Sequence, residues 1–211
     1  MPDDEVNKEF DRQEKFTGTR PVREGFELDI PALQAYMEEH VEGFSGKLKL
    51  EQFRGGQSNP TYRISAGGKK YVLRRKPSGK LLKSAHAVDR EYRVVTALGE
   101  TNVPVARTYC LCEDDSIIGS WFYIMDYVDG RIFWTLPSTP FEERAALFSS
   151  MNETIAALHK VDYKAIGLGD YGKQGNYCSR QLSIWKKQYR DSVDEKYPAM
   201  ENLIEWLEEN Q

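Results

Sequence analysis

The sequence lacks the features that mark membrane and secreted proteins. Its apolar runs extend over only a few residues, whereas a membrane-spanning helix needs about 20. Its 211 residues include three cysteines, Cys110, Cys112 and Cys178, an odd number without the spacing of a metal site. The first 15 residues are polar and acidic, unlike a signal peptide. We therefore expect a cytoplasmic protein in a reducing compartment, without a membrane partner.

An excess of positive charge is also missing. The formal net charge is −4, which argues against a nucleic-acid partner because such proteins need a basic surface to neutralise phosphates. One basic cluster, at residues 69–76, is the exception and needs its own explanation. With 40% hydrophobic and 29% charged residues, the composition is typical of a soluble globular protein with one large or two small domains.

The first half of the chain alternates between helical and strand-like patterns. Asp29 is a candidate helix N-cap, and the apolar residues after it recur at helical spacing. Apolar residues then recur at every second position, which predicts strands, before a second helix that Gly99 ends. The predicted order is a helix, three strands, a helix and two strands, at about 29–42, 48–53, 62–64, 71–75, 84–99, 106–112 and 121–128.

After Asp129 the pattern becomes helical. An apolar stripe over residues 141–158 predicts a long helix, and two more helices are expected after a glycine-rich loop. The apolar face of the last helix reaches the final residues, so we expect it to need a partner. We divide the chain into an N-terminal arm (1–24), a nucleotide-binding lobe (25–128) and the start of a helical lobe (129–211).

The glycine-rich turn between the first two predicted strands is the first candidate nucleotide-binding feature. Gly55 and Gly56 would let backbone N–H groups approach phosphate oxygens. Ser58 and Asn59, which follow Gln57, could add side-chain hydrogen bonds. Two adjacent glycines taken alone, however, fit an ordinary hairpin turn just as well.

A cation on the third strand and a carboxylate on the next helix form the second feature. Val72 and Arg74 point to the same face of the strand, so Val72 could cover an adenine ring while Arg74 reaches the phosphates. Arg75 and Lys76 are close enough to take the role of Arg74. Glu91 lies at the edge of an apolar helix face and could hold Arg74 in place. Separately, these are ordinary features of a protein surface.

The fifth strand runs into a linker that has the character of a hinge. Adenine would bind there through the Asp126 carbonyl and the Val128 N–H, with Met125 at the back of the pocket. Alone, the segment is a strand followed by a turn. The order of turn, cation, carboxylate and hinge is the layout of a protein-kinase-like fold. The expected fold class is α+β, with a five-stranded antiparallel lobe followed by helices.

Five segments carry a family resemblance. FRGGQSNPTYRI, YVLRRKP, DREYRVVTAL, FYIMDYVDG and the helix end AALHKVDY resemble the aminoglycoside-phosphotransferase-like family of kinase-fold enzymes, over about residues 25–211. The run IGLGDYGKQGNYCSRQLSIWKKQY is similar to the branch fused to acyl-CoA dehydrogenases in some eukaryotes. The family usually has lysine where Arg74 stands but tolerates arginine. The resemblance implies phosphoryl transfer from ATP, with Mg²⁺, to a hydroxyl of an unknown small molecule.

The chain departs from this family at the catalytic loop. That loop has a His-Gly-Asp run followed by an Asn and a separate metal-binding Asp, but none of His40, His86 and His159 has Asp two residues later. We therefore assign no catalytic residue and no metal ligand, and expect a truncated domain whose 211 residues cannot transfer phosphate. The alternatives are a nucleotide-binding pseudokinase and an accessory domain of an acyl-CoA dehydrogenase-type protein.

Overall fold

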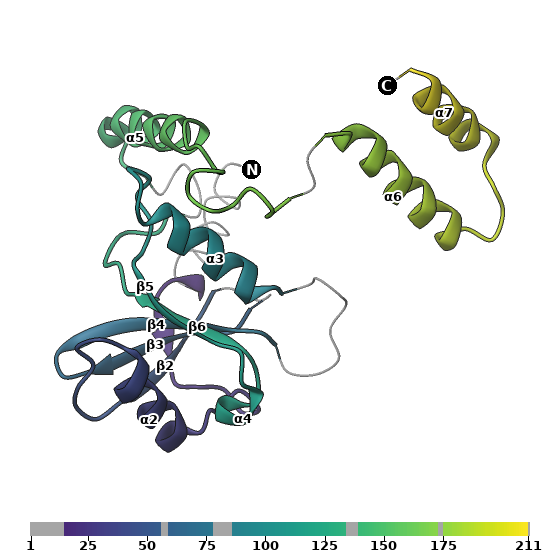
Figure 1. Ribbon diagram of the computed structural model, residues 1–211. Helices are drawn as coiled ribbons and strands as arrows, with labels where there is room; N and C mark the ends of the chain where they lie inside the picture. Colours follow the sequence, from purple (N-terminus) through teal and green to yellow (C-terminus); the bar gives the residue numbers. More distant parts are fainter. Residues whose placement is uncertain (1–14, 56–58, 78–85, 134–138, 173–174, 211) are drawn as a thin grey trace, which may run out of the picture. The chain divides into compact units, whose positions relative to one another are not determined.

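Figure 1 shows the computed structural model, which divides into two compact units, residues 1–167 and 168–211. Within the residues that the structure describes, no helix is both long and apolar enough to cross a membrane. The first unit contains the β-sheet and helices α2 to α5, and the second contains α6 and α7. The described residues are 15–55, 59–77, 86–133, 139–172 and 175–210.

The sheet has six strands in the order β1-β2-β3-β4-β6-β5, and all neighbouring strands are antiparallel. The predicted antiparallel sheet is confirmed, but the predicted count of five strands is one too low. The additional strand, β1, is only two residues long, so it carries no period-two pattern, and it pairs along the edge of β2. The strands are β1 (Thr19–Arg20), β2 (Lys49–Phe53), β3 (Thr61–Ala66), β4 (Lys69–Arg75), β5 (Thr108–Cys112) and β6 (Phe122–Asp126).

Helix α2 (Ile30–His40) covers one face of the sheet. Its N-cap is Asp29, as predicted, whose Oδ1 accepts a hydrogen bond from the Ala32 N–H at 3.0 Å. Leu33 and Met37, one helical turn apart, are completely buried, and they anchor the helix on the sheet.

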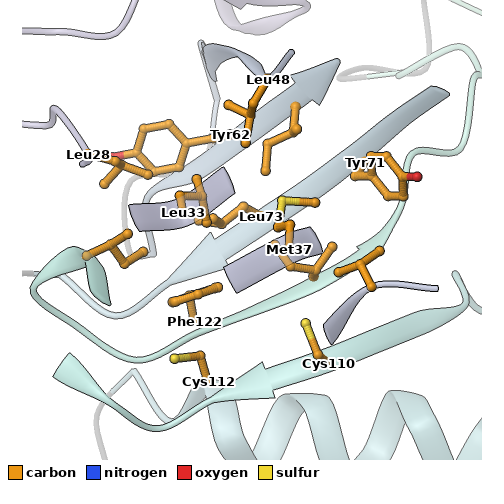
Figure 2. Packing of buried hydrophobic residues seen from close by; sticks show 14 residues of the cluster. Leu28, Leu33, Met37, Leu48, Tyr62, Tyr71, Leu73, Cys110, Cys112 and Phe122 are labelled. Atoms are coloured by element: carbon orange, nitrogen blue, oxygen red, sulfur yellow. The ribbon is translucent and has the colours of Figure 1, made fainter. Parts of the chain in front are cut away.

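The main core lies between α2 and the sheet (Figure 2). Alternate residues along each strand point into it, because successive strand side chains face opposite sides. Burying each large side chain contributes about 1.5–3 kcal/mol to the free energy of unfolding. The core strand residues with the least exposure are Tyr62, Ile64, Tyr71, Leu73, Phe122 and Ile124.

Helix α3 (Val88–Leu98) lies on the opposite face of the sheet. The ring of Tyr92 makes an edge contact with Tyr123, at 5.9 Å between centroids. Tyr123 follows Phe122, which contacts α2 through Tyr36, so the two helices pack on opposite faces of β6. This second face is the one that carries Val72 and the candidate site.

The connection between β5 and β6 contains a short helix, α4 (Asp115–Ile118), and Asp114 caps it by accepting from the Ser116 N–H at 2.8 Å. The last three helices are α5 (Phe141–His159), α6 (Tyr177–Ser192) and α7 (Pro198–Glu209). In the second unit, ion pairs link α6 to α7, such as Lys186 Nζ with Glu208 Oε1 at 2.5 Å. In the first unit, α5 has no buried residue among those described.

Candidate nucleotide site

A hollow of about 340 Å³ lies beside the glycine-rich turn. Apolar side chains and glycines form most of its wall, and one arginine supplies a positive charge. The lining residues are Phe16, Gly18, Phe53, Gly55, Thr61, Val72, Arg74 and Ile132. Of the residues predicted for a nucleotide site, Gly55, Val72 and Arg74 therefore line one hollow. Gly56, Gln57 and Ser58 lie outside the described residues.

Strand register explains why these side chains meet. Thr61 on β3 is the cross-strand partner of Arg74 on β4, and Val72 pairs with Met125 on β6. Cross-strand partners project from the same face of a sheet, so all four side chains share the α3 face. Met125 is the neighbour of Val72, as its predicted place at the back of the pocket requires, but it does not itself line the hollow.

Arg74 and Glu91 form the ion pair that the sequence predicts. Arg74 Nε lies 3.0 Å from Glu91 Oε2, and about a third of each side chain is exposed. The Arg74 Nε–H makes no hydrogen bond, so the contact is electrostatic. Tyr123 lies beside the pair, and burial, together with the charge of Glu91 and a hydrogen bond to it, raises the pKa of the Tyr123 hydroxyl. Arg74 is thus tethered to α3 at the edge of the hollow.

The structure separates Arg74 from the two cations that follow it. Arg75 is 4% exposed on the other face of the sheet, and its Nη1 donates to the Ile118 carbonyl at 3.3 Å. The Lys76 ammonium lies 3.6 Å from the centre of the Trp121 ring and 3.5 Å from Asp89 Oδ1. Of the three cations, Arg74 alone lines the hollow.

Asn59 has a partner that sequence reasoning did not find. Its Oδ1 lies 2.8 Å from Nδ1 of His86, and its side chain is buried. Its carbonyl accepts a hydrogen bond from Thr61 Oγ1 at 3.0 Å. The amide oxygen of Asn59 is therefore engaged by a residue 27 positions away, and in this structure it fixes the end of the turn.

The hinge residues Asp126 and Val128 differ in their surroundings. The Asp126 carboxylate accepts a hydrogen bond from the Tyr109 hydroxyl at 2.5 Å. The backbone N–H of Asp126 donates to the Arg107 carbonyl at 2.8 Å. Burial and then this carboxylate raise the pKa of Tyr109 to about 12. The Val128 side chain is exposed, and within the described part of the chain its N–H makes no hydrogen bond. Among the described residues, the Val128 N–H thus has no acceptor.

Several lining residues were not predicted. Phe53 lies immediately before the turn, and the nearly parallel ring of Tyr127 lies 6.4 Å from its centroid. The period-two pattern of β2 could have placed Phe53 on this face, which it shares with Glu51, the partner of Arg63 on β3. Phe16, Gly18 and Ile132 belong to segments without a strand pattern, so no local signal places them here.

A second hollow of about the same volume lies at the other end of the strands, around the β3–β4 turn. It is lined by Lys47, Lys49, Lys69 and Lys70, with small residues between them. The predicted basic cluster thus divides between two places: Lys69 and Lys70 belong to this second hollow, and Arg74 belongs to the first.

Mg²⁺ was expected for a complete domain of this kind. Within the described ranges, no group of three or more His, Cys, Asp or Glu residues is arranged to hold a metal ion. We therefore assign no described residue to Mg²⁺ and derive no step through it.

Comparison with known proteins decides the family. The model of the phosphotransferase enzyme family (APH) matches residues 49–211, which is most of the chain. The chain belongs to this family. A solved structure from Ralstonia eutropha JMP134, provisionally named an aminoglycoside phosphotransferase, shares 52% identity with a TM-score of 0.71. The match covers 85% of this chain and 53% of that one. The predicted kinase-like fold is thereby confirmed.

Curated relatives of this phosphotransferase-family chain carry acyl-CoA dehydrogenase names. "Probable acyl-CoA dehydrogenase IBR3" of Arabidopsis thaliana is 45% identical over 203 residues, or 90% of this chain and 25% of the relative. "Acyl-CoA dehydrogenase family member 11" of Mus musculus is 43% identical over 189 residues, or 87% of this chain and 24% of the relative. The chain therefore spans about a quarter of these relatives, and the predicted resemblance to the fused branch is confirmed.

Proposed function

We propose that the chain is the nucleotide-binding part of an ATP-dependent small-molecule kinase. The complete enzyme would transfer a phosphoryl group to a hydroxyl of a small molecule not yet identified. One observation carries the proposal: Arg74 lines a hollow beside Gly55 and is tethered to α3 by Glu91. An arginine held in place beside a glycine-rich turn is suited to binding phosphate oxygens.

Four lining residues and the nearby hinge have chemical tasks in this proposal. The backbone at Gly55 and the guanidinium of Arg74 bind the phosphates, while Phe53 and Val72 provide an apolar surface for the base. The free N–H of Val128 offers the hinge donor that an adenine edge needs. Bringing the phosphates to a fixed place is what a kinase scaffold contributes, because phosphoryl transfer depends mainly on positioning and charge stabilisation.

In this family the Asp of a His-Gly-Asp run would accept the proton of the acceptor hydroxyl. No His-Gly-Asp run occurs in the sequence. We therefore expect the purified chain to bind ATP without transferring its γ-phosphoryl group. Incubation with γ-labelled ATP and a set of small alcohols tests this, and labelled phosphate appearing on any alcohol would contradict it.

Calorimetric titration of the chain with ATP tests the nucleotide site. We expect one site per chain and an affinity that falls about tenfold or more in Arg74→Ala, because a charge-assisted hydrogen bond is worth about 1.5–3 kcal/mol. Lys47→Ala is the matched control, because it removes a cation from the second hollow. Equal losses of ATP affinity in the two variants would show that ATP binding depends on the overall charge of the chain and not on this site.

A second function is favoured by the names of the relatives. The chain matches about a quarter of proteins named acyl-CoA dehydrogenases, so it could serve as an accessory domain that stabilises such a protein without chemistry of its own. A third alternative is a pseudokinase, which would bind a nucleotide without transferring phosphate. ATP affinity separates them: saturable binding supports the kinase or the pseudokinase, and no binding supports the accessory domain.

A further inference from the structure

The segment from Phe16 to Arg20 is fixed next to the glycine-rich turn. Thr19 in β1 is the antiparallel partner of Phe53 in β2. The Arg54 N–H donates to the Gly18 carbonyl at 3.1 Å, and Arg54 Nε donates to the Thr19 carbonyl at 3.3 Å. The main chain of this segment is therefore hydrogen-bonded to the residues that lead directly into the turn.

A side-chain network strengthens this attachment. Thr19 Oγ1 donates to Glu51 Oε1 at 2.8 Å, and Arg63 Nη2 donates to Glu51 Oε2 at 2.6 Å, so one carboxylate links β1, β2 and β3. The hydrogen bond from Arg63 and that from Thr19 lower the pKa of Glu51, which keeps its charge at neutral pH. On the next residue, the Gln52 Oε1 accepts from the Arg23 N–H at 3.2 Å.

The attached segment forms part of the wall of the first hollow. Phe16 and Gly18 line it together with Phe53, Val72 and Arg74. Gly18 has φ +81°, a left-handed conformation that side chains other than glycine rarely adopt, and it lets the chain turn between Phe16 and β1. The wall that this segment adds is apolar, whereas the charge of the hollow comes from Arg74.

These residues lie outside the part of the chain that the family model explains. The model begins at residue 49, some thirty residues after Phe16, so the match does not include this segment. The segment therefore supplies a wall of the pocket that the family match does not include.

We propose that residues 16–20 form a wall of the nucleotide pocket and that the Phe16 ring contacts the adenosine moiety. The inference rests on the proposed nucleotide site. A phenyl ring offers no hydrogen-bond donor to phosphate oxygens, but its face suits a base or the apolar side of a ribose. Phe53 and Val72 line the same hollow, so the base would contact apolar side chains from β2 and β4 as well as Phe16.

Affinities of the 211-residue chain for ATP and for adenosine, measured by calorimetry, test the proposal. Loss of an aromatic stacking partner lowers the affinity for a base by about tenfold. We expect this loss in Phe16→Ala for both ligands, because the base is common to both. Arg74→Ala should weaken ATP alone. Phe141→Ala is the matched control, since Phe141 is 81% exposed and does not line the hollow.

Phe16→Leu keeps an apolar side chain and separates a lost contact from a lost fold, which circular dichroism checks in every variant. We expect it to bind both ligands several-fold more weakly than the unaltered chain. Unaltered adenosine and ATP affinities in Phe16→Ala or Phe16→Leu would overturn the proposed contact but leave the nucleotide site intact. If the unaltered chain binds neither ligand, the proposed function fails together with this inference.

Discussion

The sheet with α2 and α3 differs from helix α5 in how apolar side chains find partners. Among the described residues, every completely buried large side chain, such as Tyr62 or Phe122, belongs to α2, α3 or the sheet. Helix α5, by contrast, exposes an apolar stripe that includes Phe148, Met151 and Ile155. The part that forms the candidate nucleotide site thus contains its own core, whereas the α5 stripe is uncovered by the described residues.

This difference bears on function because a binding site needs a rigid support. The hollow is built on strands whose other face is buried against α2, so the side chains at its wall start from a fixed backbone. We therefore expect the site to form whether or not another segment covers the apolar stripe of α5. Four predictions test that division, in order of decreasing effect.

The same substitution in the two regions gives the strongest test. Leu73 is completely buried beneath α2, whereas Leu158 in α5 is 45% exposed. We expect Leu73→Ala to lower the free energy of unfolding by about 2–5 kcal/mol, because it removes packing and leaves a cavity. Leu158→Ala should cost less than about 1 kcal/mol. Urea unfolding followed by circular dichroism measures both variants. Comparable losses of free energy of unfolding would contradict the difference between the two regions.

The ion pair on the α3 face should act on nucleotide binding through Arg74. Glu91→Gln removes the charge that tethers the guanidinium, and we expect ATP affinity to fall about tenfold. The Arg74→Ala, Glu91→Gln double variant should bind no more weakly than Arg74→Ala alone, because the pair acts as one unit. Asp89→Asn, which alters the pair with Lys76, is the control in the calorimetric titration. Additive losses would contradict this account.

The N-cap of α2 marks another difference between the two regions, since α5 has Pro140 at its N-cap and no side-chain cap. Asp29→Ala removes the acceptor for the Ala32 N–H and should lower the free energy of unfolding by about 1 kcal/mol. Asp194→Ala, at an exposed position without a hydrogen bond among the described residues, should change it little. Thermal unfolding compares the two, and an equal response would mean that the cap does not support α2.

The smallest expected effect depends on pH. Hydrogen bonds from Arg63 and Thr19 lower the pKa of Glu51 below its ordinary 4.5. Its contribution, less than about 1 kcal/mol for a partly exposed pair, is complete above that value and is lost as the pH falls through the lowered pKa. Glu51→Gln should therefore be the less stable protein at pH 7, with the difference shrinking toward pH 3.

Urea unfolding at both pH values measures this difference. Glu113→Gln is the control, because the exposed Glu113 has no partner among the described residues. The account predicts that the difference in free energy of unfolding between Glu51→Gln and the unaltered chain shrinks from pH 7 to pH 3. A constant difference would contradict the role of the carboxylate.

Local patterns in the sequence predicted most of the fold. The cap at Asp29, the period of β4 and the alternation that puts Val72 and Arg74 on one face are properties of a few neighbouring residues. The Arg74–Glu91 pair was also predictable, because the order of strand and helix indicated a known arrangement. The family match and the solved structure confirm that arrangement.

What the sequence did not reveal depends on contacts between distant segments. The contact between Asn59 and His86 joins residues 27 positions apart, and β1 pairs with a strand about thirty residues later. Neither segment has a periodic pattern of its own. The basic cluster likewise looked like a single feature, and only the strand register and the two hollows show that Arg74 is separate from the lysines.

Chemical-shift mapping of the ¹⁵N-labelled chain during titration with ATP tests the central claim most directly. The account predicts saturable shifts at Gly55, Val72 and Arg74 in the first hollow, with little change at Lys47 and Lys69 in the second. Shifts confined to the lysine-lined hollow, or no shifts at millimolar ATP, would contradict the proposal that this sheet binds a nucleotide.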